Sequence, residues 1–382
     1  MEVIRRKKGI GNIEECISEY REKGREKGSK RIVKGLMIVM MMVVMGCNSG
    51  GVKGEGAGGG DGRGLSGAMM EVGRSAENAF YSFLELVSDV LGFTVTKDTT
   101  RNKVGEYFSG LGKKLGEASE ELEKVASKAI VGVDKGEESK NAKNPVRIAV
   151  DTAKGVLSSL KTHLESLKDI GDGNKVVDVA NNQNGVAANS DALKKAYKAL
   201  KGIVDVAKAQ KVAEPSASNV TLKQDSIGVD AKDGAKVLAI GAAGAAVGEK
   251  AALIVSSVRG EEMLASIVKS GEGDATGNTG QANADTSALK FARGDATAAN
   301  LAKEEAKAGA VGGGIALRSL VKDGKLAANN NDDKAVQSAG ITAVNKLLGA
   351  VEGIVKKTVK NILEKVKQEV DKARAPKAAG QN

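Results

Sequence analysis

The chain has 382 residues, of which 28% are charged and only 2% are aromatic, and its formal net charge is +10 at pH 7. Tryptophan is absent, and most of the few aromatic residues fall between Phe80 and Phe108. A nucleic-acid-binding protein would be expected to cluster its basic residues and to interleave stacking aromatic side chains with them. This composition therefore argues against nucleic acid as a partner.

An apolar run near the N-terminus has the features of an export signal. The run from Leu36 to Met45 is purely apolar, but as a helix it would rise only about 15 Å, roughly half of what crossing a bilayer requires. Basic residues flank it on the N-terminal side alone, and the small residue Gly46 follows it, as in a secretory signal peptide. A buried core helix is the weaker alternative, because such a helix would alternate apolar and polar positions.

The end of this run, VVMGC at residues 43–47, resembles the lipobox of bacterial lipoproteins, with Val44 in place of the usual leucine. The resemblance implies that the chain is cut after Gly46. Cys47 would then become the new N-terminus and carry N-palmitoyl and S-diacylglycerol groups. Acyl chains hold a protein to a bilayer with about 0.8 kcal/mol per buried CH₂, and stable anchoring needs more than one chain. The other cysteine, Cys16, lies in the leader, so the mature chain has none for a disulfide.

We predict four segments from these signals and from the composition, which is rich in helix-forming residues and holds three prolines. They are a leader over 1–46, a lipidated flexible tether over 47–73, an all-α domain over 74–375 and a disordered tail over 376–382. The leader is unusually long, so we expect translation to start near residues 30–33. A formal G-x-G-x-x-G at residues 54–59 lacks the flanking strand and helix of a dinucleotide site, and we interpret it as part of the tether.

Hydrophobic periodicity predicts helices in the first part of the domain. One covers residues 74–91, and a second carries an apolar stripe from Val104 to Val125. A third covers residues 144–171, with Pro145 at its first helical position.

The last helix is predicted over residues 332–374, because acidic residues begin it, basic residues occupy its last turn and Pro376 follows its end. Gly349 and Gly353 in this helix predict the close approach of another backbone.

The middle of the chain alternates short helices with polar stretches. Helices are predicted over 191–208, 235–258 and 261–269. Stretches rich in Asn, Asp, Gly and Ser predict loops over 171–191, 214–234, 269–287 and 322–334. We expect these loops to bury little and therefore to tolerate substitution.

The sequence holds few residues for chemistry. His163 is the only histidine, and it is predicted on the lysine-rich outer side of the third helix. A single histidine excludes an H-E-x-x-H metal site and leaves one candidate catalytic base, which has no thiol partner. No phosphate-binding loop or complete calcium loop occurs. The carboxylates alternate with lysines, as on solvated helix faces. We therefore predict that the protein is not an enzyme and holds no cofactor and no metal.

Several stretches resemble the variable large proteins of relapsing-fever Borrelia. They are GCNSGG at 46–51, AFYSFLELVSDVLGF at 79–93, VGEYFSGLGKKL at 104–115 and a long C-terminal block over 312–360. The related Vls surface lipoprotein of Lyme spirochaetes shares the IALRSLVKDGKLA type of element at 315–327. The resemblance covers residues 36–382.

The resemblance implies an all-α fold, an elongated helical bundle whose long N- and C-terminal helices form a membrane-proximal stalk below a loop-rich membrane-distal end. It implies a lipid-anchored major antigen of the outer membrane that faces the exterior, meets host antibodies, and evades them by one-at-a-time expression of variants. The alternative is an adhesin that binds host glycosaminoglycans or host proteins through lysine-rich loops. The sequence leaves open whether the chain forms a homodimer.

Overall fold

The computed structural model describes residues 92–130, 145–277 and 280–374, all within one unit of the chain, Gly62–Asn382. The predicted leader, tether, first helix and tail lie outside these residues. The described residues are helical, and their extended backbone pairs only at isolated bridges, which confirms the all-α prediction. The helices are α4 (Arg101–Ile130), α5 (Pro145–Ser166), η2 (Lys168–Ile170), α6 (Ser190–Ala209), α7 (Gln224–Ile227), η3 (Lys232–Leu238), α8 (Gly248–Ser256), α9 (Gly260–Val268), η4 (Glu272–Thr276), α10 (Ala288–Arg293), α11 (Ala298–Leu301), α12 (Ala308–Leu320) and α13 (Asp333–Arg374).

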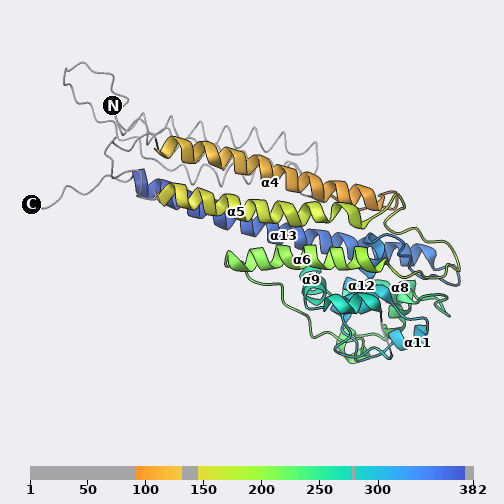
Figure 1. The fold of residues 1–382 in the computed structure, drawn as a ribbon. Coiled ribbons are helices and arrows are strands. Elements are labelled where there is room, and N and C mark those ends of the chain that lie inside the picture. The colour runs from red at the N-terminus through yellow and green to blue at the C-terminus, as the bar shows by residue number, and fades with distance from the viewer. Residues whose placement is uncertain (1–91, 131–144, 278–279, 375–382) are drawn as a thin grey trace, which may run out of the picture. The chain divides into compact units, whose positions relative to one another are not determined.

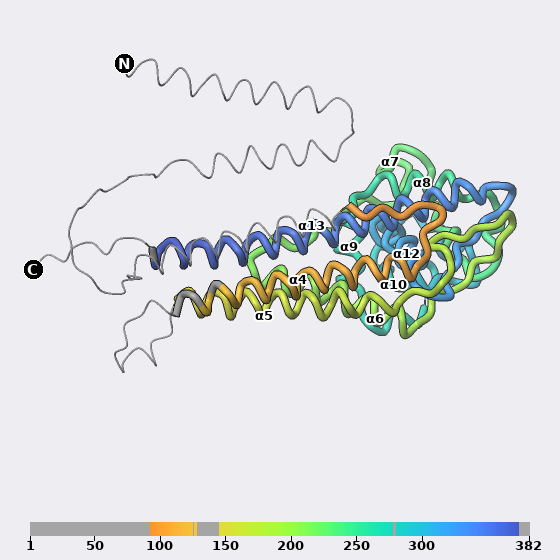
Figure 2. The backbone as a smooth tube through the Cα atoms, turned by 90° about the horizontal axis from the view of Figure 1, so that it is seen from above, coloured from red at the N-terminus to blue at the C-terminus, as the bar shows by residue number. Residues whose placement is uncertain are grey.

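Three long helices run side by side. Helix α5 packs against both α4 and α13, and α6 packs against α5 and α13 (Figure 1). The short helices gather where α4 begins and α5 ends, and the opposite end holds the end of α4, the start of α5 and the end of α13 (Figure 2). We call the first the loop-rich end and the second the helical end. The segments that join the longer helices at the loop-rich end include residues 171–189, 220–231 with α7, 239–247, 294–307 with α11, and 321–332.

Apolar residues at helical spacing place the long helices against one another. The predicted stripe of α4 is buried from Val104 to Leu122, and that of α5 from Ala153 to Leu164. Helix α13 buries its predicted stripe from Val344 to Val370 and a second row beside it. The second row includes Ala343, Leu347, Ala350, Ile354, Thr358 and Leu363. Two rows are needed because α13 contacts α5 and α6 on one side and α8, α9 and α12 on others.

In the described part of the chain, no helix combines the length and the apolar character that crossing a bilayer requires. Helix α13 is 42 residues long, but lysine is the most frequent residue at its exposed positions.

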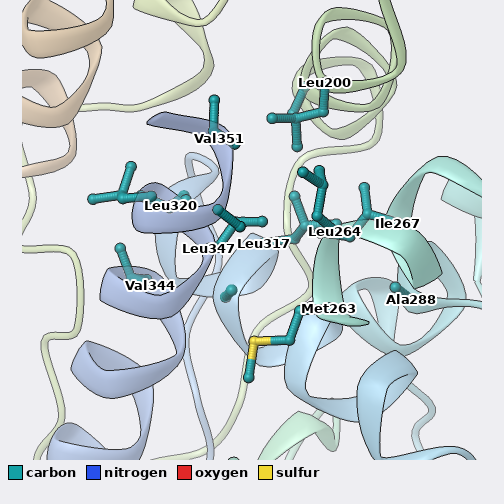
Figure 3. Close-up of a cluster of buried hydrophobic side chains, with 14 of the residues drawn as sticks. Leu200, Met263, Leu264, Ile267, Ala288, Leu317, Leu320, Val344, Leu347 and Val351 are labelled. Carbon is teal, nitrogen blue, oxygen red and sulfur yellow. The ribbon is translucent and has the colours of Figure 1, made fainter. Parts of the chain in front are cut away.

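Helix α12 is the centre of the core, because every residue from Ala308 to Leu320 is buried. It packs against α9, α10 and α13, and leucine side chains of α12 meet those of α6, α9 and α13 in a shared cluster (Figure 3). Its glycines allow this close packing: a Cβ at Gly314 would lie 2.5 Å from the Cβ of Phe291 in α10. The sequence pattern does not predict this helix.

Two predictions about helices are wrong. Residues 235–258 do not form one helix: η3 ends at Leu238 and α8 begins at Gly248. Between them Gly241 and Gly244 have φ of +116° and +80°, which a helix cannot contain. Gly349 and Gly353 do not mark a close backbone approach, since a Cβ at either position would meet nothing within 4 Å.

Helix α13 supplies charged caps to both ends of α8. The Asp332 carboxylate, just before α13, accepts hydrogen bonds from the backbone N–H groups of Val247 and Gly248, the latter at 2.8 Å. The Lys346 ammonium donates to the backbone oxygens of Val255 and Val258 at 2.8 and 2.7 Å. An anion at a helix N-terminus and a cation at its C-terminus are both stabilising. The sequence predicted that the acidic pair at 332 and 333 would serve α13 itself.

The start of α9 lies directly on α13. A Cβ at Gly260 would lie 1.9 Å from the backbone oxygen of Lys346, and no side chain could relieve that contact. Glycine is therefore required at Gly260 for reasons of space.

We expect Gly260→Ala to lower the free energy of unfolding by about 2 kcal/mol or more, because backbone must move to admit the methyl group. The matched control is Gly349→Ala, which lies on an exposed face of α13. This change should raise the free energy of unfolding by about 0.5–1 kcal/mol, because alanine favours the helix. Urea unfolding followed by circular dichroism measures both. Equal effects of the two changes would contradict the described packing of α9 on α13.

We also expect Asp332→Asn to lower the free energy of unfolding by about 1–2 kcal/mol, since the charge that α8 meets at its N-terminus is lost. Hydrogen exchange should quicken in residues 247–252. Asp333→Asn is the control, because Asp333 lies in the first turn of α13 and should leave α8 unchanged. If both changes quicken exchange in α8 equally, Asp332 is not its cap.

Candidate functional site

The predicted lipidation site, Cys47 with cleavage after Gly46, lies outside the described residues, as do the tether and its glycine motif. The lipid anchor therefore stays a prediction. Among the described residues, the candidate functional surface is the loop-rich end.

The segments of the loop-rich end hydrogen-bond to one another. Gly185 and Gly241 exchange backbone hydrogen bonds of 2.8 and 3.0 Å, and Val186 and Lys325 exchange two of 3.0 Å. The segments also contribute to the core, which corrects the expectation that the loops bury little. Their buried apolar residues include Val176, Val177, Leu222, Leu326 and Ala327. Only part of each segment is thus available as surface.

Arg101, the first residue of α4, binds three parts of the loop-rich end. It is 4% exposed, and its Nη1 donates to both carboxylate oxygens of Asp172 at 3.0 Å. Its Nε donates to the backbone oxygen of Ser319 at 2.8 Å, and its Nη2 to that of Gly324. Partial burial opposes ionisation of Asp172, but the Arg101 charge and two backbone N–H groups outweigh it and lower the pKa of Asp172. Arg101 thus joins α4 to the C-terminal end of α12.

Arg318, within α12, is fully buried and has no carboxylate partner among the described residues. Its Nε donates to the backbone oxygen of Ala292 at 2.7 Å and its Nη1 to that of Ala239 at 3.1 Å. These oxygens lie at the C-terminal ends of α10 and η3, where the helix dipole favours a cation. Burial, together with the charge of Arg293, lowers the pKa of Arg318 to about 9, so the guanidinium stays protonated at neutral pH.

Asparagine side chains join two loops at the surface. The Asn181 side chain accepts from the Asn331 backbone N–H at 2.7 Å, and the Asn182 side chain accepts from that of Asn330 at 2.9 Å. Asn182, Asn330 and Asn331 have φ between 52° and 62°, a region that asparagine tolerates better than most residues. These residues are exposed, so this junction is part of the accessible surface.

The segment that leads into α4 is attached to α13. The Asn345 side chain pairs with the backbone of Val95 through hydrogen bonds of 2.8 and 3.0 Å. The Glu352 carboxylate accepts from the hydroxyl of Tyr107 and, at 3.3 Å, from the N–H of Gly92. Burial raises the pKa of Glu352, and these two hydrogen bonds oppose the shift. The chain therefore passes from residue 92 to α4 at a fixed place on α13.

The side chains that bind the segments of the loop-rich end to the long helices were not predicted from the sequence. Arg318 had a local signal, because it is the one charged residue in an apolar run from Ile315 to Val321, as a buried charge would be. Arg101 and Lys346 have no comparable signal, because their partners lie far away in the sequence.

The described residues offer little for catalysis or metal binding. They contain no group of three or more His, Cys, Asp or Glu residues that could hold a metal ion. His163 does not lie on an outer face as predicted: it is half-buried between α5 and α6, where a Cβ at Gly202 would lie 2.3 Å from its ring. That the protein is not an enzyme stays a prediction.

Comparison with known proteins gives the family. Residues 76–370 match the family described as Borrelia lipoprotein. The chain is 65% identical over 323 residues to variable large protein 25 of Borrelia hermsii, covering 84% of this chain and 88% of that protein. It is 56% identical over 332 residues to variable large protein 21, covering 85% and 90%.

The fold is similar to that of the Lyme disease variable surface antigen VlsE of Borrelia burgdorferi, with a TM-score of 0.60 and 24% identity, covering 79% of this chain and 97% of that chain. The sequence match and the fold agree, and the chain belongs to the Borrelia lipoprotein family, with the variable large proteins among its relatives.

Proposed function

We propose that this protein is a variable major surface antigen, anchored by lipid in the outer membrane and facing the exterior. Its role is antigenic variation: variants are expressed one at a time, and each presents a different surface to host antibodies. The observation that carries the proposal is the identity to two variable large proteins along most of the chain.

The arrangement of the helices supports display of the loop-rich end away from the membrane. The described chain begins beside α13 at the loop-rich end, where Gly92 and Val95 are attached. The predicted helix over 74–91 would span about 27 Å, enough to carry the chain back along the long helices. In this proposal the helical end faces the membrane, and the loop-rich end faces outward.

The loop-rich end offers two kinds of position for variation. Exposed side chains such as Asp225, Val229 and Glu305 lie outside the core, so substitution there costs little stability. Buried ones such as Leu222 and Leu326 must stay apolar, because truncating a buried leucine costs about 2–5 kcal/mol. Variation should therefore change the exposed side chains and keep the buried ones.

Cys47→Ala tests the anchor. The wild-type protein should partition into the detergent phase of a phase-separating detergent and incorporate labelled palmitate. The Cys47→Ala protein should do neither, because acyl chains supply its membrane affinity. Cys16→Ala is the control and should behave as wild type, because Cys16 belongs to the predicted leader. Detergent-phase partition of Cys47→Ala would contradict the proposed anchor.

The adhesin alternative finds less support in the structure. Several lysines of the loop-rich end are paired with acidic residues. Lys232 pairs with Glu304 at 2.6 Å, and Asp233 pairs with Lys236 at 2.7 Å and with Lys250 at 3.1 Å.

We therefore expect no retention of the purified protein on heparin at about 150 mM salt, where such exposed charges are well screened. Retention at that salt concentration, lost on Lys223→Ala or Lys303→Ala, would revive the adhesin alternative. Elution from the column against a salt gradient measures it.

A further inference from the structure

Two arginine side chains lie near each other beneath the loop-rich end. Arg318 comes from the middle of the core in α12 and has 0% exposure, and Arg293 is the last residue of α10. They are close enough for the charge of Arg293 to disfavour the charge of Arg318. Like charges in a buried place repel each other strongly, because the protein interior screens them weakly.

Each arginine also keeps a buried donor without a partner. Arg318 uses its Nε and Nη1 on backbone oxygens, and Arg293 uses its Nη1 on the backbone oxygen of Ala188 at 2.5 Å. Arg318 Nη2 and Arg293 Nε are also buried, but neither atom donates a hydrogen bond. A buried donor that loses water without gaining a partner is costly, and a buried charge without compensation is more so.

The nearest acidic residue in the sequence does not compensate these charges. Asp295 is almost buried, and its Oδ1 accepts hydrogen bonds from the Thr297 N–H at 2.7 Å and the Asn300 amide at 3.3 Å. No carboxylate of the described residues contributes to the electrostatics of Arg318. The positive charge beneath the loop-rich end therefore lacks a protein counter-ion there.

Backbone lies close to Arg318 Nη2. Gly294, which follows Arg293, has φ of +76° and no side chain on this side. A Cβ at Gly294 would lie 2.2 Å from Arg318 Nη2 and 2.1 Å from the backbone oxygen of Leu238. A ligand beside Nη2 must share this space with the backbone, which favours a single-atom ion over a sulfate, a phosphate or a carboxylate.

We propose that Arg293 Nε and Arg318 Nη2 together bind one small monovalent anion of the halide class, chloride in ordinary salt solutions. The anion accepts from both unpartnered donors and offsets the repulsion between the two guanidinium groups. It links α10 to α12 beside the end of η3, and thereby stabilises the segments 239–247 and 294–307 of the loop-rich end. Anion binding to the folded state alone raises its stability by mass action.

The first test compares the thermal unfolding of the full-length protein in potassium chloride and in potassium gluconate at equal ionic strength, so that general screening is constant. The melting temperature should be higher in chloride by about 4 °C, because gluconate is too large for the site. The Arg293→Met protein should show no difference between the two salts. Arg259→Met is the control: Arg259 is 70% exposed and pairs with Glu262, so this protein should keep the difference.

Equal melting temperatures in the two salts would overturn the proposal, and so would a chloride effect that survives Arg293→Met. The second test does not depend on any variant. Crystals of the wild-type protein grown in bromide should show an anomalous scattering peak between Arg293 and Arg318. Density there without an anomalous signal would identify a water molecule instead, and would overturn the proposal.

Discussion

Charged side chains from elsewhere in the chain satisfy backbone groups at the ends of several of the short helices. A helix end leaves several N–H or C=O groups without intrahelical partners, and short helices are marginal on their own. Here Asp332 and Lys346 serve the two ends of α8, Arg101 serves the end of α12, and Arg318 serves α10 and η3. The long helices α4 and α13 and the buried α12 therefore help to position the short elements that they contact.

In this arrangement, the residues that hold the loop-rich end together are largely distinct from those that form its surface. We call the buried side chains, the caps and the backbone bridges its frame. Apolar side chains such as Val177 and Leu222 fill the core beneath the loops, and single backbone bridges such as Gly185 with Gly241 join the loops above it. Exposed side chains such as those of Asp225 and Glu305 take part in neither, whereas the exposed side chains of Asn181 and Asn182 do join two loops. A family whose members differ in sequence can thus retain the fold, provided that the buried residues and the caps persist.

Periodicity in the sequence located the helices that have one buried face. Helices α4, α5, α6, α9 and α13 lie close to where their apolar stripes predicted them. Helix α12 was not predicted, because it is buried on all sides and rich in glycine. It therefore has no polar face that would give its sequence a helical hydrophobic period. The alanine-rich stretch at 235–258 was wrongly predicted as one helix. Its composition favours a helix, but Gly241 and Gly244 turn the chain. Tertiary contacts decided both cases.

Local sequence patterns could not predict the charged side chains that cap the short helices, because these side chains bind backbone groups. The same property allows the surface residues to change. Lys346 and Arg101 act on backbone oxygens, of Val255 and Ser319 among others, that lie far from them in the chain. Nothing in the local sequence marks a backbone oxygen as a partner, because every residue type has one. For the same reason, replacing the side chain at such a position leaves the partner in place. A frame that holds its loops by their backbone can therefore accept many different loop sequences, except where, as at Gly294 and Gly260, a second backbone or a guanidinium occupies the space of the side chain.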